Sequence, residues 1–339
     1  MTASRIEPVA HGGDIDAARR RFPGAPEPWI DLSTGINPHA YPVPPLDISL
    51  WQRLPQSGAE RALREAAAQR YGAANADQVV SAPGSQALIQ IVPRIISAAD
   101  VVILGPTYGE HVVSWARCGH RVDERGSLTE IGGARVAVIV NPNNPTGRTI
   151  AAQQLRELAG ELAQRGGLLV VDEAFADFEG AGSSLVPQLP GAAAVVLRSF
   201  GKTYGLAGMR LGFAITSDEA LCQRLRAEIG PWAVPAPAIA IGTAALRDST
   251  WLSAASADLA SDCARLDTLL QNTGFEIIGG THLFRLARHA RARAIADKLG
   301  RAGILVRSFP AKAEWLRFGL PGSEAEWQRL ASALAETKG

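Results

Sequence analysis

The sequence SFGKTYGLAGMRLG fills residues 199–212 and follows an apolar run at residues 192–197. It places Lys202 in a glycine-rich loop, with Ser199 three residues before it and Arg210 eight residues after it. A lysine amine can form a Schiff base with an aldehyde, and a hydroxyl and a guanidinium can bind a phosphate nearby. The stretch therefore suits a covalently held cofactor that carries a phosphate group.

Two other interpretations fit parts of this stretch. A surface turn with a solvated lysine would have the same composition. Gly201-Lys202-Thr203 also matches the end of a P-loop, but that motif requires glycine five residues before Gly201, where the chain has Val196. The P-loop is thereby excluded, and the surface turn stays open on these residues alone.

The composition favours an enzyme that acts on a small molecule. The 339 residues include 34 basic and 33 acidic side chains without a strongly basic run, which argues against nucleic acid or an anionic membrane as a partner. Three widely spaced cysteines, Cys118, Cys222 and Cys263, argue against a disulfide framework and a cysteine metal site, so we expect a reducing compartment and no metal. The sequence has neither a signal-peptide core nor a membrane-spanning segment, and we expect a cytoplasmic protein.

The pattern along the chain predicts three parts. Residues 1–45 are rich in turn formers and predict an N-terminal arm that packs with the small domain and the active site. Residues 46–235 predict a large cofactor-binding domain, and residues 236–339 a small α+β domain. Short apolar strands alternate with helices in the large domain, which predicts an α/β fold with a mostly parallel sheet covered on both faces. The predicted strands are Gln78–Ala82, Val101–Leu104, Arg135–Val140, Leu168–Val171 and Ala192–Leu197.

Capping residues and prolines predict where several elements begin and end. A capping box at Ser57-Gly58-Ala59-Glu60 predicts a helix that ends at Gly72, and a second at Ser323-Glu324-Ala325-Glu326 predicts the final helix. Residues 87–97 predict a helix in spite of Pro93. The proline-rich residues 231–237 predict a linker.

The candidate ligand-binding residues follow the predicted strands. Ligands of a parallel sheet bind at the carboxyl ends of its strands. Gly84-Ser85-Gln86 forms a glycine turn at a helix start, whose amides suit a phosphate. Tyr108, Asn144 and Asp172 follow the next three strands, and Ser199 and Lys202 follow the last. We therefore expect these side chains to meet at one edge of the sheet.

In this order and spacing the residues resemble the fold-type I pyridoxal-phosphate (PLP) enzymes, the class I/II aminotransferase group, from roughly residue 31 to the end. The resemblance implies the fold-type I transferase fold and PLP as cofactor. It implies that Lys202 forms the Schiff base, that Asp172 pairs with the pyridine nitrogen and that Tyr108 stacks on the ring, and these three are the expected catalytic residues. The expected cofactor-binding residues are Gly84, Ser85, Gln86, Tyr108, Asn144, Asp172, Ser199, Lys202 and Arg210.

Three stretches resemble one branch of that group, which decarboxylates L-threonine O-3-phosphate in cobalamin biosynthesis. They are HGGD at residues 11–14, DLSTGINP at residues 31–38 and DEAFADF at residues 172–178. The resemblance implies a PLP-dependent carbon–carbon lyase that forms (R)-1-amino-2-propanol O-2-phosphate and works as a homodimer. An aminotransferase of histidinol phosphate or a related amino acid is the alternative. The expected substrate-binding residues are His11, Gly35, Asn37, Arg307 and Arg317.

Two positions depart from the pattern of the group. Phe175 stands where many aminotransferases have a tyrosine that bonds the phenolic oxygen of the cofactor, which weakens the expectation of transamination. Arg53-Leu54-Pro55-Gln56 lacks the tyrosine of the usual Arg-Tyr-Pro pattern, which reaches the cofactor of the neighbouring subunit. That contact between subunits is therefore not expected in the same form here.

Overall fold

The computed structural model describes residues 11–180, 182–191 and 193–336. They divide into two compact units. Unit 1 contains Tyr41–Asn144 and Arg148–Trp251, and unit 2 contains Pro145–Gly147 together with residues 11–40 and 252–336. The division of the chain at residues 45 and 235 stays a prediction.

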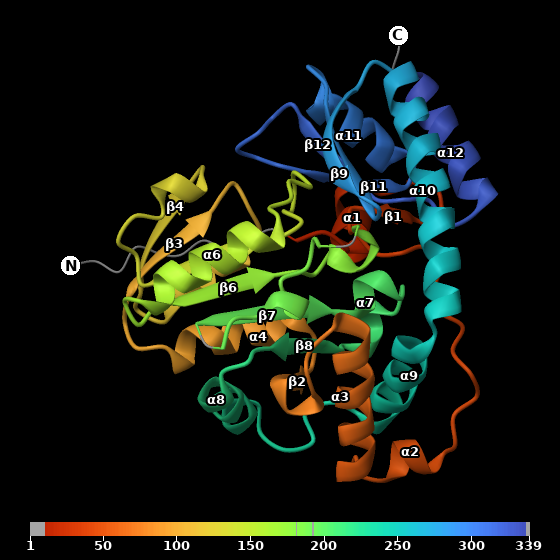
Figure 1. Cartoon of the computed structure of the whole chain (residues 1–339). Helices are drawn as coiled ribbons and strands as arrows, with labels where there is room; N and C mark the ends of the chain where they lie inside the picture. Colours follow the sequence, from red (N-terminus) through yellow and green to blue (C-terminus); the bar gives the residue numbers. More distant parts are fainter. Residues whose placement is uncertain (1–10, 181, 192, 337–339) are drawn as a thin grey trace. The chain divides into compact units, whose positions relative to one another are not determined.

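Unit 1 is built on a seven-stranded sheet with the order β2-β8-β7-β6-β5-β3-β4 (Figure 1). Neighbouring strands pair in parallel except at β8, which runs antiparallel to both β2 and β7. All five predicted strands of this unit are present, although Ala192, the predicted first residue of one of them, lies outside the described residues. The strands are β2 (Val79–Ala82), β3 (Asp100–Leu104), β4 (Arg121–Arg125), β5 (Val136–Val140), β6 (Leu168–Asp172), β7 (Ala194–Ser199) and β8 (Gly212–Ile215).

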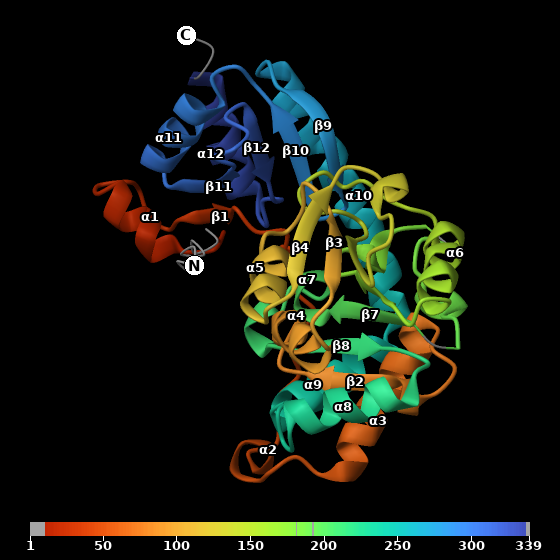
Figure 2. The same ribbon diagram turned by 90° about the vertical axis from the view of Figure 1, so that its left-hand side faces the viewer.

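Helices cover both faces of this sheet, because successive strand residues point to opposite sides. Along β6, Leu169 and Val171 join the core under α3, α6 and α9, whereas Leu168 and Val170 join the core under α4, α5 and α8. Figure 2 shows α5 and α6 on opposite sides of β3. The helices are α3 (Ser57–Tyr71), α6 (Ala152–Ala163) and α9 (Ala236–Arg247) on one face, α4 (Ser85–Ile91), α5 (Glu110–Arg117) and α8 (Glu219–Ile229) on the other, and the short α2 (Ser49–Gln52) and α7 (Phe200–Thr203).

Unit 2 contains a five-stranded sheet with the order β1-β11-β12-β10-β9. The N-terminal strand β1 pairs in parallel with β11, and the other neighbours are antiparallel. Helix α11 packs against β11 and β12 (Figure 2). Helix α10 (Ser249–Asn272) starts in unit 1 and continues in unit 2. The other elements are α1 (Ile15–Arg21), β1 (Ile30–Leu32), β9 (Glu276–Thr281), β10 (Phe284–Arg288), α11 (Ala292–Arg301), β11 (Ile304–Ser308), β12 (Trp315–Phe318) and α12 (Glu324–Ala335).

One of the two predicted capping boxes is wrong. Helix α3 begins at Ser57 itself, so its N-cap is Gln56, and no side chain caps it. The predicted end is confirmed, because Gly72 closes the helix in the left-handed conformation with φ 79°. At α12, Ser323 is the N-cap and accepts a hydrogen bond from the Glu326 amide, as predicted.

The predicted helix at residues 87–97 and the predicted linker both need correction. Helix α4 ends at Ile91 and continues as a 3₁₀ helix, Val92–Ile95, since Pro93 has no N–H to donate within an α-helix. Helix α9 begins inside the predicted linker, at Ala236, with a proline in its first turn, a position that proline tolerates.

Candidate functional site

The first group of predicted site residues lies at one edge of the unit 1 sheet. Asp172 ends β6 and pairs in register with Val140 on β5 and with Leu197 on β7. Ser199 ends β7 and pairs with Gly212 at the start of β8. Because β8 is antiparallel to its neighbours, its first residues lie beside the carboxyl ends of β2 and β7.

Asp172 is held there by two hydrogen bonds. Its carboxylate is buried, with Oδ1 accepting from the Ala174 amide at 3.1 Å and Oδ2 lying 2.9 Å from Nε2 of His111, which is also buried. His111 lies on α5, and the sequence analysis missed it. No local signal marked it, because Tyr108 lies before α5, which begins at Glu110, and Asp172 is far from His111 in the sequence. The pair gives a carboxylate of fixed direction, as required of a partner for a protonated ring nitrogen.

Lys202 lies on the short helix α7, directly after β7. Its Nζ is 4.9 Å from the centre of the Phe175 ring, three residues after Asp172. The loops that follow β6 and β7 therefore bring the amine close to the chain that carries the carboxylate. Phe175 offers the amine a ring face where the related tyrosine would offer a hydroxyl.

Glycine and arginine form a cradle beside the end of β2. A Cβ atom at Gly84 would lie 2.7 Å from Nη2 of Arg210, and one at Gly212 would collide with the amide nitrogen of Ser85. Gly84 has φ 84°, and Arg210 itself has the left-handed φ of 52°, which is uncommon for a residue with a side chain. The space that a side chain would need at these two glycines is filled by the Arg210 guanidinium and by the backbone of Gly84 and Ser85, so glycine allows these groups to approach the turn closely. This arrangement suits a phosphate group.

Tyr108 and Gln86 are joined in one hydrogen-bond chain. The Tyr108 hydroxyl donates to Oε1 of Gln86 at 3.1 Å, and Nε2 of Gln86 donates to the buried Glu110 at 2.9 Å. Gln90 donates to the same Glu110 oxygen at 3.0 Å. In this arrangement Gln86 orients the ring of Tyr108, and contact of Gln86 with a cofactor stays a prediction.

Asn144 lies in the loop after β5, whose conformation is set by its neighbours. Asn143 accepts a hydrogen bond from the Thr107 hydroxyl at 2.6 Å and donates to the Pro106 carbonyl at 3.0 Å. These bonds tie the loop after β5 to the loop after β3. Asn144 is the last residue of unit 1 before the chain enters unit 2 at Pro145.

The second group of predicted residues belongs to unit 2. Arg317 on β12 is buried, donates from Nη2 to the Ser33 carbonyl at 2.8 Å and lies 5.0 Å from the centre of the Phe284 ring. Arg307 on β11 is directly opposite Arg317 in the register of the two strands. Side chains directly opposite each other on paired strands are neighbours on one face of the sheet.

The arm that carries His11 lies on the segment that follows β1. The Gly13 amide donates to Oγ of Ser33 at 2.7 Å, and a Cβ atom at Gly12 would lie 2.5 Å from the Ser33 carbonyl oxygen. Ser33 thus contacts both the arm and Arg317. The two remaining residues, Gly35 and Asn37, are buried in the same segment.

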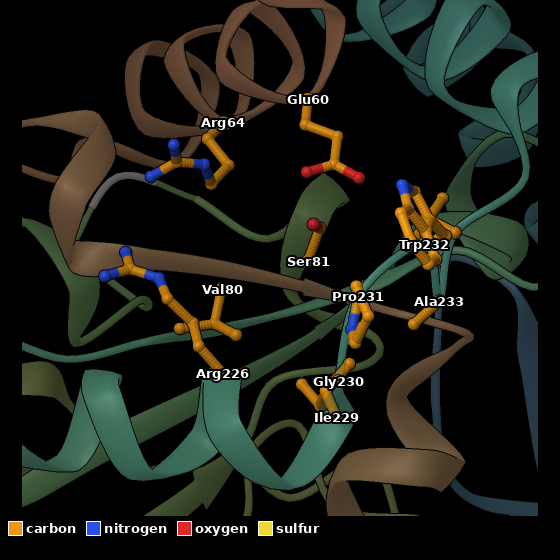
Figure 3. A pocket seen from close by; sticks show the side chains of 11 residues that line it. Glu60, Arg64, Val80, Ser81, Arg226, Ile229, Gly230, Pro231, Trp232 and Ala233 are labelled. Atoms are coloured by element: carbon orange, nitrogen blue, oxygen red, sulfur yellow. The ribbon is translucent and has the colours of Figure 1, made fainter. Parts of the chain in front are cut away.

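One pocket of unit 1 lies apart from the predicted site residues. A pocket of about 200 Å³ in unit 1, lined by Glu60, Arg64, Arg226 and Trp232 among others, contains no predicted site residue (Figure 3). Within residues 11–180, 182–191 and 193–336, no three metal-binding side chains come together. Over the same ranges, no helix is long and apolar enough to span a membrane.

Comparison with known proteins gives a consistent result. Residues 28–334 match the family Aminotransferase class I and II. Threonine-phosphate decarboxylase of Sinorhizobium sp is 41% identical over 339 residues, which cover 97% of this chain and 98% of that protein. Threonine-phosphate decarboxylase of Pseudomonas aeruginosa is 41% identical over 330 residues, with 96% and 97% covered. The crystal structure of histidinol-phosphate aminotransferase from Sinorhizobium meliloti in complex with PLP superposes with a TM-score of 0.80 at 21% identity, covering 99% of this chain and 98% of that one. The structural likeness supports the fold.

Proposed function

Because the chain belongs to the class I and II aminotransferase family, we propose that it decarboxylates L-threonine O-3-phosphate to (R)-1-amino-2-propanol O-2-phosphate. Carbon dioxide leaves from Cα and a proton takes its place. Support comes from two relatives that are 41% identical over nearly the whole chain and are named for this reaction. The absence of a tyrosine at Phe175 agrees with a reaction other than transamination. We also propose that the product enters cobalamin biosynthesis, as the resemblance of residues 11–14 and 31–38 implies.

PLP is the cofactor of this family member, and the residues of unit 1 fit it. We assign the turn at Gly84 and the adjacent Arg210 guanidinium to its phosphate, together with Ser85 and Ser199. Bound PLP supplies an electron sink for the electron pair left at Cα. Asp172 is directed by His111 and stabilises positive charge on the ring nitrogen.

Three further roles complete the assignment for the cofactor. Lys202 holds its aldehyde carbon. Tyr108, oriented by Gln86, faces the ring. Asn144 donates to the phenolic oxygen, the position for which Phe175 offers no donor.

The observation that carries the substrate proposal is the cross-strand pair of Arg307 and Arg317. Like charges directly opposite each other on paired strands are destabilising, so a ligand with two anionic groups would relieve the repulsion. Threonine phosphate carries a carboxylate and a phosphate on a short carbon chain. We assign Arg317 to the carboxylate and Arg307, with the arm that holds His11, to the phosphate. Gly35 and Asn37 shape the same substrate site from the segment after β1.

Two anchored ends also determine which bond breaks. Which bond at Cα reacts depends on the direction in which the protein holds the substrate. Holding the two ends of the substrate limits its rotation about Cα and selects the carboxylate bond. Unphosphorylated threonine lacks one anchor and is therefore a poor substrate in this proposal.

We further propose that the protein acts as a homodimer in the cytoplasm. Five large apolar side chains are exposed among the described residues, and four of them, Val43, Ile48, Trp51 and Leu54, lie in the short segment 43–54. Exposed apolar groups gathered in one segment favour a protein–protein contact, and a second copy is the partner the resemblance implies. The three cysteines are unpaired, which supports a reducing compartment. Light scattering on the wild type and on Trp51→Glu tests the dimer, since the charge should shift the mass towards the monomer.

One assay separates the proposed activity from its alternative. The purified protein with PLP is offered threonine phosphate, and carbon dioxide is measured; in parallel it is offered histidinol phosphate with 2-oxoglutarate, and glutamate is measured. We expect carbon dioxide from threonine phosphate and little glutamate. If glutamate forms and no carbon dioxide is released, the decarboxylase proposal is contradicted and the aminotransferase is supported.

A further inference from the structure

A buried group of charged side chains lies beside β6 and β7, and none of the roles above uses it. We call it the Arg198 cluster: Arg70, Glu173, Asp177, Arg198 and Thr203. The Arg198 guanidinium donates from Nη1 to Glu173 at 2.7 Å and from Nη2 to Asp177 at 2.7 Å. Arg70 donates to Asp177 at 3.2 Å. The side chains of Arg198, Glu173 and Asp177 are at most 4% exposed, and the two arginines balance the two carboxylates in charge.

Two members of the cluster are chain neighbours of proposed site residues. Glu173 directly follows Asp172, and Arg198 directly precedes Ser199. Successive residues of a strand point to opposite faces of the sheet, so Arg198 and Ser199 lie on opposite faces. Arg198 packs 4.4 Å from the centre of the Tyr71 ring, on the α3 face. The cluster therefore supports the proposed cofactor site from the other side of the sheet.

A third member connects the cluster to the lysine. Thr203 directly follows Lys202, and its hydroxyl donates to Oδ2 of Asp177 at 2.5 Å. Asp177 thus joins Arg198, at the end of β7, to the helix that carries Lys202. Burial acts to raise the pKa of Asp177, but the charges of Arg198 and Arg70 outweigh it, and the pKa lies below its usual range. Asp177 is therefore an anion that can accept all of these bonds at neutral pH.

Energetics favour a geometric role for the cluster over a stabilising one. Removing two charges from water is costly, and a buried ion pair often contributes no more stability than apolar side chains of the same volume. The directed hydrogen bonds of a guanidinium, however, hold two loops in one relative position. Here those loops are the segment after β6, with Glu173 and Asp177, and the segment after β7, with Thr203.

We propose that Arg198 and Asp177 are positioning residues that set the distance and direction between Asp172 and Lys202, acting through Glu173 on one side and Thr203 on the other. The inference rests on the proposed function, because it concerns the residues assigned to PLP. It adds that part of the geometry of the cofactor site is determined from the opposite face of the sheet. A displacement of reacting groups by about 1 Å can cost roughly 100-fold in rate, so the loss of one link in the cluster should be measurable.

The test replaces Thr203, because that link can be removed with little change of volume. Thr203→Val removes the hydroxyl, and Thr203→Ser keeps it. Thr216→Val is the matched control: its hydroxyl is also buried and donates to the Ala194 carbonyl at 2.6 Å, at the far end of β7. Thr216→Val should lose stability in a similar way without affecting Lys202.

Four quantities are measured for each variant. The affinity for PLP is measured on the apoprotein; the pH midpoint of the cofactor's visible absorbance, kcat and KM are measured with PLP bound. For Thr203→Val we expect a displaced pH midpoint, weaker PLP binding and a kcat lowered about tenfold, with KM within a factor of about two. Thr203→Ser should restore wild-type values to within a factor of about three. If Thr203→Val matches the wild type, or if Thr216→Val changes the same quantities equally, the cluster only holds the fold and the inference is overturned. If Thr203→Val does not fold, Thr203→Ala removes the same hydroxyl and is measured instead.

The absorbance and the PLP affinity do not depend on which substrate the enzyme uses. A wild-type protein that fails to decarboxylate threonine phosphate would therefore contradict the proposed function, while a displaced midpoint in Thr203→Val would still support the positioning role. Borohydride reduction of the PLP-loaded protein, followed by mass spectrometry, tests separately whether Lys202 holds the cofactor. PLP on another lysine would overturn the site and the inference together.

Discussion

Nε2 of His111 lies 2.9 Å from Oδ2 of Asp172, and both side chains are buried in unit 1. The second carboxylate oxygen accepts from the Ala174 amide, so the direction of the carboxylate is determined from two sides. A carboxylate that needs no rearrangement during the reaction stabilises a positive charge more effectively than one that must reorient. The relationship joins α5 to the end of β6 and gives His111 a role that its position in the sequence did not reveal.

Replacing either member of this pair should lower turnover, by different amounts. Asp172→Asn keeps the volume and removes the charge, so we expect kcat to fall by about 100-fold or more while PLP still binds. His111→Gln removes a hydrogen bond to a charged group, worth roughly 1.5 kcal/mol or more, and should lower kcat about tenfold. His120→Gln is the control, since His120 is buried and bonds the Pro93 carbonyl. If kcat of Asp172→Asn stays within a few-fold of the wild-type value, a residue other than Asp172 must pair with the ring nitrogen of PLP.

Lys202→Ala should abolish turnover and the covalent attachment of PLP. The cradle of Gly84 and Arg210 is unchanged in this variant, so we expect PLP to bind reversibly and to be lost on gel filtration. The visible absorbance after gel filtration and the activity are the measurements. Lys298→Ala replaces a lysine of α11 in unit 2 and serves as the control. It should keep both the visible absorbance after gel filtration and the activity. Covalently bound cofactor retained by the Lys202→Ala variant would contradict the assignment of the lysine.

Cys263 gives a prediction for the pH dependence of stability. Burial raises the pKa of its thiol to about 11, above the value of about 8.5 for an unfolded chain. The fold favours the neutral thiol, so this contribution to the free energy of unfolding is fully present below about pH 8.5 and is lost as the pH rises towards 11. We expect Cys263→Ala to be less stable than the wild type at pH 7, with a difference that shrinks by up to about 3 kcal/mol at high pH. Urea unfolding at several pH values measures this. A difference in the free energy of unfolding that stays constant with pH would show that the thiol does not contribute.

The arm that carries His11 should be sensitive to a single methyl group. A Cβ atom at Gly12 would lie 2.5 Å from the Ser33 carbonyl, so Gly12→Ala must displace the arm. If His11 contacts the phosphate of the substrate, KM for threonine phosphate should rise roughly tenfold, with PLP affinity unchanged. Gly133→Ala is the matched control, because no atom lies within 4 Å of its added Cβ. If KM is unchanged in both variants, the arm does not contribute to substrate binding.

The sequence predicted those elements whose patterns are local. Strand β3, predicted at Val101–Leu104, is observed at Asp100–Leu104, because a short apolar run between helices needs no tertiary information. Strand β4 was missed, since its sequence RVDER belongs to an exposed edge strand without an apolar pattern. The capping motif was correct at Ser323 and wrong at Ser57, because four residues do not determine the register of a helix start.

The candidate site was predictable only in part, for a similar reason. Asp172 and Lys202 follow apolar strands of a parallel sheet, and the topology alone brings such positions to one edge. The side chain that contacts Asp172, and the one that we propose to position Lys202, come from elsewhere in the fold. His111 lies on α5, and Arg198 lies on the opposite face of β7. No spacing within the sequence encodes a contact between such distant segments.

In the proposed function, the cross-strand pair of arginines binds the two anionic ends of the substrate separately. Arg307 is opposite Arg317 in the register of β11 and β12, and Arg317 is anchored through the Ser33 carbonyl. Arg307→Ala should therefore weaken the binding of the phosphate by about 2 kcal/mol or more, which is roughly 30-fold in KM for threonine phosphate. It should scarcely alter kcat/KM for unphosphorylated threonine, which has no phosphate to lose.

Two controls make this prediction specific. Arg288→Ala removes an exposed arginine of the same sheet, paired with Glu276 on β9. It should change neither KM for threonine phosphate nor kcat/KM for threonine. PLP affinity, measured on the apoprotein, should equal that of the wild type for both variants. Equal losses on threonine and on its phosphate would mean that Arg307 supports the fold of unit 2, and the phosphate would then have to be assigned to other residues.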